Sequence, residues 1–66
     1  MMTEQEIEAM LQKMKEERRT IWISRYSVGD GMARMTINKG RDGIHLVSDE
    51  FAKQMFKNYV FNPNNQ

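Results

Sequence analysis

The side chains best suited to recognition in this chain are two aromatic and two basic groups near its middle. They are Trp22, Tyr26, Arg34 and His45. Indole and phenol rings offer large, rigid contact surfaces, and arginine adds a planar charge, a combination enriched at protein interfaces. The same side chains also stack on bases and contact phosphates. They therefore predict a binding site for a protein or for a nucleic acid.

Catalysis finds little support in the sequence. The chain has no cysteine, and it lacks the nucleophile elbow, the Walker A loop and the dinucleotide-binding glycine motif. Asp30 and Asp42 fall in two different turns, which we expect to lie about 20 Å apart at about 3.3 Å per strand residue, too far for a paired-carboxylate site. His45 is the only histidine, and no spacing brings it a nucleophile or metal-binding partners. We expect no enzymatic activity, no metal and no cofactor.

Length and charge limit the remaining classes. The 66 residues favour one domain, and the absence of cysteine excludes a disulfide framework. A net charge of +1 gives no general attraction to polyanions. No apolar run reaches the roughly 18 residues of a membrane helix, and the N-terminus lacks the apolar segment of a secretory signal. We therefore expect a cytoplasmic protein with no membrane partner.

Helical periodicity marks both ends of the chain. A first helix is predicted over about residues 4–18, where Thr3 and Glu6 have capping-box spacing. Its apolar face comprises Ile7, Met10, Leu11 and Met14. A second helix is predicted over about residues 49–60, with Ser48 as its N-cap. Its apolar positions are Phe51, Ala52, Met55, Phe56 and Tyr59. Residues 1–61 should form the domain, and residues 62–66 should form a frayed tail.

Three strands are predicted between the helices, at about residues 20–28, 32–38 and 43–47, because β-branched, aromatic and alternating residues gather there. Glycine-containing turns join them. These turns are too short for parallel crossovers, so the sheet should be an antiparallel meander in chain order. The α-β-β-β-α order predicts a small α+β domain with both helices on one face of the sheet.

Alternation along each strand assigns residues to the two sheet faces. The face under the helices should hold Ile21, Ile23, Ala33, Met35, Ile37, Ile44 and Leu46. The outer face should hold Trp22, Ser24, Tyr26, Arg34, Thr36, Asn38, His45 and Val47. Arg25 falls on the covered side, from which its long stem should reach solvent. Met35 and Leu46 are thus predicted core residues, whose truncation to alanine should cost roughly 2–5 kcal/mol.

Two functions follow from this arrangement. The favoured one is protein–protein binding, either with a second copy or with a larger protein that the chain regulates or inhibits. A homodimer would also add to the small core of so short a chain. The alternative is a nucleic-acid-binding module that uses Trp22, Tyr26 and Arg34. Double-stranded-RNA-binding domains are similar in element order, but their second helix begins with lysines, whereas Asp49 and Glu50 here would repel phosphate.

Overall fold

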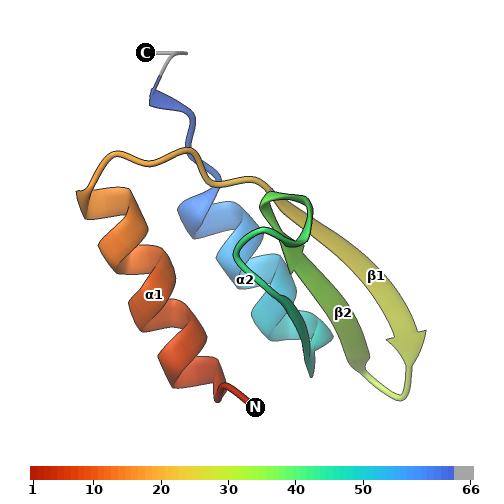
Figure 1. Ribbon diagram of the computed structural model, residues 1–66. Helices are drawn as coiled ribbons and strands as arrows, with labels where there is room; N and C mark the ends of the chain where they lie inside the picture. Colours follow the sequence, from red (N-terminus) through yellow and green to blue (C-terminus); the bar gives the residue numbers. More distant parts are fainter. Residues whose placement is uncertain (64–66) are drawn as a thin grey trace.

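The computed structural model, which describes residues 1–63, contains two helices and three strands in the order α1-β1-β2-β3-α2 (Figure 1). Their bounds are α1 Glu4–Glu16, β1 Ile23–Gly29, β2 Met32–Ile37, β3 Ile44–Ser48 and α2 Asp49–Tyr59, with a 3-10 turn, η1, at Asn38–Gly40. The sheet is antiparallel in the order β1-β2-β3. The predicted α+β class, element order and meander are confirmed. Most of the predicted frayed tail, residues 64–66, lies outside the described residues.

Both helices begin at the caps that the sequence predicts. At the start of α1, the Glu6 backbone N–H donates to Thr3 Oγ1 (3.1 Å) and the Thr3 N–H donates to Glu6 Oε1 (2.8 Å). At the start of α2, the Phe51 N–H donates to Ser48 Oγ (3.1 Å). Each bond satisfies a backbone donor that has no partner within the helix. Because Ser48 also ends β3, the last strand runs directly into α2.

The hairpin between β1 and β2 turns on two residues, Asp30 and Gly31. Both have positive φ, +56° and +73°, as the type I′ turn of a tight hairpin requires. A β-bulge at Val28 interrupts the register between Ser27 and Gly29. The turn and the bulge together set the cross-strand pairing of the whole hairpin.

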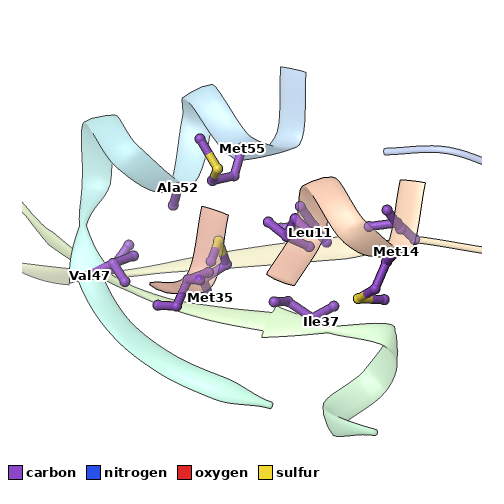
Figure 2. Packing of buried hydrophobic residues seen from close by; sticks show 11 residues of the cluster. Leu11, Met14, Met35, Ile37, Val47, Ala52 and Met55 are labelled. Atoms are coloured by element: carbon purple, nitrogen blue, oxygen red, sulfur yellow. The ribbon is translucent and has the colours of Figure 1, made fainter. Parts of the chain in front are cut away.

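Both helices pack on one face of the sheet and enclose a single hydrophobic core (Figure 2). Every member is at most 2 % exposed, and the members are Ile7, Leu11, Met14, Ile21, Ile23, Ala33, Met35, Ile37, Val47, Ala52 and Met55. No polar or charged residue of residues 1–63 is fully buried. The fully buried core of this small domain is therefore entirely apolar.

The faces of β1 and β2 are as predicted, but β3 is inverted. Val47 is buried opposite Ala33, whereas Ile44 and Leu46 are 61 % and 55 % exposed. The prediction that Ile44 and Leu46 belong to the core was wrong. Placing Val47 on the outer face was also wrong, because Val47 points into the same core as Ala52 (Figure 2).

The junction between β3 and α2 explains this inversion. Ser48 pairs with Met32 at the end of the sheet and also caps α2. With Ser48 held there, alternation turns Val47 toward the helices and Leu46 away from them. In the short Ile-His-Leu-Val segment, Ile44 and Leu46 point to one face of the strand and Val47 points to the other. The pattern alone therefore favoured the wrong face, because that face holds more apolar residues.

The segment after α2 returns to the start of the sheet. Ile21 and Phe61 exchange two backbone hydrogen bonds, of 2.7 Å and 3.0 Å. The Arg18 guanidinium lies 5.6 Å from the centre of the Phe61 ring, in cation–π geometry. The chain beyond α2 therefore lies beside the link between α1 and β1 (Figure 1).

Candidate functional site

The outer side of the sheet carries two cross-strand rows of side chains that no described helix covers. In one row, Tyr26 pairs with Arg34, and Arg34 pairs with Leu46. In the neighbouring row, Ser24 pairs with Thr36, and Thr36 pairs with Ile44. We call the surface made by Ser24, Tyr26, Arg34, Thr36, Ile44 and Leu46 the open face.

Large apolar groups dominate the open face. Tyr26 is 63 % exposed, and it lies in the same surface as the exposed Ile44 and Leu46. Three strands about 4.8 Å apart and two rows about 7 Å apart give a patch on the order of 200 Å². A stable protein interface buries about 800 Å² on each partner. The open face would therefore supply about a quarter of one partner's share of such an interface, and the surrounding surface would supply the rest.

Arg34 is the one charged side chain of the open face. Its guanidinium lies 5.2 Å from the centre of the Tyr26 ring, a cation–π contact between directly paired residues. The ion pairs within residues 1–63 join other residues, Arg19–Asp42, Arg25–Asp49 and Lys53–Asp49. The positive charge of Arg34 thus lies over the Tyr26 ring and forms no ion pair with a carboxylate of residues 1–63.

Arg25 carries a similar charge on the covered side of the sheet, where it forms an ion pair. It lies opposite Met35, on the helix side of the sheet, as predicted. Its Nη1 reaches Asp49 Oδ1 at 2.5 Å, at the start of α2. This contact lowers the pKa of Asp49. The ion pair ties the β1 edge to α2 and leaves Arg34 as the arginine available on the other side.

Trp22 lies apart from the Tyr26–Arg34 pair. It is 51 % exposed where the chain enters β1, and its ring makes an edge-to-face contact with Phe56 of α2, with centroids 6.1 Å apart. Among the described residues, no ring contact joins Trp22 to Tyr26. The prediction that Trp22 faces away from the helices is wrong in this respect, and Trp22 does not extend the open face.

His45 lies on the covered side, opposite Met35, so its predicted place on the outer face was wrong. Its Nε2 is shielded from solvent and has no hydrogen-bond partner in the described part of the chain. Gly43 gives the imidazole its space, because a Cβ at Gly43 would collide with the ring. The sequence-predicted site therefore separates into the Tyr26–Arg34 pair, an edge tryptophan and a covered histidine.

We expect Gly43→Ala to destabilise the protein by roughly 2–3 kcal/mol. Gly43 has a φ of +115°, which an L side chain rarely adopts, and the added methyl would also displace the His45 ring. Gly31→Ala is the control, since Gly31 has a φ of +73° with open space around it and should cost only about 1–2 kcal/mol. Urea denaturation measures both changes. Equal losses would show that the contact with His45 is unimportant.

A second feature is an open cleft at one end of the sheet, where β1 begins and where η1 follows the last residue of β2. Its volume is about 710 Å³, and it is lined by Arg19, Thr20, Trp22, Asn38, Lys39, Arg41 and Asp42. Apart from Trp22, the sequence pattern did not identify these residues as a site. They are separated along the chain, and only the turn at η1 brings them together.

Asn38 holds the wall of this cleft together. Its Oδ1 accepts a hydrogen bond from the Trp22 N–H (2.7 Å). Its Nδ2 donates to the Thr20 carbonyl (2.9 Å) and to Asp42 Oδ2 (2.8 Å). Asn38 also has a φ of +52°, a left-handed conformation that asparagine tolerates better than most residues. Its predicted role as an outer-face residue is replaced by that of a clamp between two chain segments.

Acid should weaken this clamp. The hydrogen bond from Asn38 and the nearby Arg19 guanidinium, at 3.1 Å, hold the pKa of Asp42 below its usual value. A lowered folded-state pKa stabilises the fold fully above the unfolded value of about 3.9 and progressively less as the pH falls through the folded value. We expect the free energy of unfolding to fall as the pH drops below about 5, and to fall less in Asp42→Asn.

Urea denaturation across this pH range checks that expectation. Asp30→Asn removes the same charge from the β1–β2 turn, so it separates the local effect from a change in net charge. Identical acid sensitivity in the unmodified protein and in Asp42→Asn would contradict the role given to Asp42.

The comparisons with other proteins add no further assignment. Protein-family models, curated proteins and solved structures yield no match to this chain. Within residues 1–63, no helix has the length and apolarity needed to cross a membrane. The same residues contain no group of three or more histidine, aspartate or glutamate side chains placed to hold a metal ion.

Proposed function

We propose that this chain is a small, non-enzymatic interaction protein that binds another protein through the open face. One observation carries the proposal: the exposed Tyr26 and Leu46 flank Arg34, an exposed cation with no ion pair among residues 1–63. Aromatic and arginine side chains are the types that dominate binding energy when a partner covers them. Covering a surface of a larger protein would in turn regulate or inhibit it.

The chemistry of the open face defines the partner. Tyr26, Ile44 and Leu46 favour an apolar surface, and Arg34 favours a carboxylate placed at the centre of that surface. A second copy fits less well. A two-fold contact through the open face would bring the Arg34 side chains of the two copies close together. Like charges placed side by side oppose association.

Nucleic-acid binding through this face has weaker support. The alternative depended on Trp22, Tyr26 and Arg34 acting together, but Trp22 packs against Phe56. The open face carries one cation, whereas binding to phosphates draws on several. Protein binding is therefore the function that the geometry supports better.

Affinity capture with matched arginine variants tests the proposal. Arg34→Glu reverses the charge of the open face, and Arg41→Glu reverses a charge in the cleft. We expect one protein, captured from a nuclease-treated lysate of the native host and then purified, to bind the unmodified chain and Arg41→Glu but not Arg34→Glu. Equal binding by all three, or binding lost only in Arg41→Glu, would overturn the proposal.

Sedimentation of the purified chain tests the second copy as occupant. We expect a monomer at micromolar concentration, because the open face has no acidic group to meet Arg34. A dimer that Leu46→Asp converts to monomer would assign the open face to self-association and would contradict a different protein as its partner.

A further inference from the structure

The cleft beside Trp22 is a separate surface from the open face, and the two share no residue. It lies at the end of the sheet where three chain segments meet: the link from α1, the start of β1 and the turn at η1. Its volume of about 710 Å³ falls within the range of small-molecule sites.

The charges of the cleft favour an anion. Three cations, Arg19, Lys39 and Arg41, line it together with one carboxylate, Asp42, which leaves two positive charges in excess. Asp42 is engaged by Arg19 at 3.1 Å. Within the described part of the chain, neither Lys39 nor Arg41 forms an ion pair. The charge of Arg41 also acts on the adjacent Asp42, so the excess positive charge of the cleft is shared among its three cations. An excess of two positive charges matches a phosphate monoester, which carries about −1.5 to −2 at neutral pH.

Trp22 gives the same cleft a surface for an aromatic ring. Its indole is held by the edge-to-face contact with Phe56, and its backbone N–H is held by Asn38. The side chain nevertheless stays half exposed. A half-exposed indole is suited to stacking, and stacking on bases tolerates any sequence because every base has a π-face.

The backbone of the cleft is also fixed in an uncommon conformation. Asn38 and Lys39 are consecutive non-glycine residues with left-handed φ values of +52° and +58°. A left-handed conformation costs free energy in a non-glycine residue, and it persists where surrounding contacts hold it in place. The three hydrogen bonds of Asn38 do so here. The result is a preformed rim that carries Lys39.

From these observations we propose that the cleft binds a nucleotide unit, with its base against Trp22 and its phosphate between Lys39 and Arg41. The chemistry is shared by a free mononucleotide and by the terminal nucleotide of a single strand. This site is independent of the protein-binding open face, so failure of one leaves the other standing.

Trp22 provides the assay, because it is the only tryptophan in the chain. Its fluorescence is followed while the intact protein is titrated with 5′-AMP, adenosine, inorganic phosphate or a short 5′-phosphorylated oligoadenylate, which keeps the base and sugar of 5′-AMP. We expect saturable quenching by 5′-AMP, with affinity at least about tenfold above that of adenosine, since a charge-assisted hydrogen bond contributes at least that factor. Inorganic phosphate should compete with 5′-AMP only weakly, because it has no ring to stack.

The double variant Lys39→Asn/Arg41→Gln should lose at least about tenfold in affinity for 5′-AMP. Asparagine tolerates the left-handed backbone of Lys39, so the fold should persist. Arg34→Ala, which removes a cation from the open face, should bind 5′-AMP unchanged.

The oligonucleotide arm identifies the source of the ligand. Affinity at least tenfold above that of 5′-AMP assigns the cleft to a strand end, and any smaller difference assigns it to a free nucleotide. No saturable quenching by either probe would overturn the proposal. So would equal affinity for adenosine and 5′-AMP, phosphate competition as strong as that of 5′-AMP, or a loss in Arg34→Ala as large as in the double variant.

Discussion

Met35→Ala is expected to cost roughly 2–5 kcal/mol of unfolding free energy, whereas Leu46→Ala should cost less than about 1 kcal/mol. Met35 is fully buried in the central strand, between the two helices and the sheet (Figure 2). Leu46 is 55 % exposed on the open face. Because a domain of this size has stability near the lower end of about 5–15 kcal/mol, the first change should leave an unfolding free energy of only about 0–3 kcal/mol.

Urea denaturation of the two variants side by side makes this comparison. Leu46→Ala serves as the control, since it removes a similar amount of apolar side chain from the adjacent strand. Equal losses in the two variants would mean that β3 presents Leu46 to the helices after all. Stability unchanged by Met35→Ala would mean that the core lies elsewhere.

Arg34→Glu is expected to weaken binding of the purified partner at least about 30-fold, the change that corresponds to about 2 kcal/mol. The substitution removes the cation–π contact with Tyr26 and places a like charge against the carboxylate proposed for the partner. Its effect on folding should be small because Arg34 is an exposed cross-strand residue. Calorimetry or surface plasmon resonance measures the dissociation constant.

Salt dependence and Arg41→Glu complete that experiment. Arg41→Glu should bind within about threefold of the unmodified chain, because Arg41 lines the cleft and not the open face. Raising salt from about 50 to about 200 mM should weaken a largely apolar contact modestly, whereas a nucleic acid held through several phosphates would lose about a hundredfold or more. Loss on that scale would contradict a protein as the main ligand.

Local patterns were sufficient to predict most of the fold. The capping box at Thr3 and the N-cap at Ser48 marked the helix starts, and the Asp30–Gly31 turn marked the first hairpin. Each of these signals depends on neighbours within about four residues of one another. The face of β2 was also predictable, because apolar and polar residues alternate along it, and Ile21 and Ile23 gave the start of β1 a matching apolar side.

The candidate site was predictable only where its residues pair directly across strands. Tyr26 and Arg34 share a face because the tight hairpin sets their register. The inversion of β3 was not predictable, because Ile-His-Leu-Val has apolar residues on both faces of the strand. The junction with α2 decides which of these faces points toward the helices. The cleft needed contacts between residues about twenty positions apart, such as that of Arg19 with Asp42, and no periodicity reports these.

Amide chemical-shift mapping of the purified chain with the partner recovered by capture tests the central claim most directly. Binding through the open face predicts that the largest shifts cluster on β1, β2 and β3 around Tyr26, Arg34 and Leu46, with small shifts along α1. Shifts that concentrate on the exposed side of α1, or around the cleft, while those three residues stay unchanged would contradict the account.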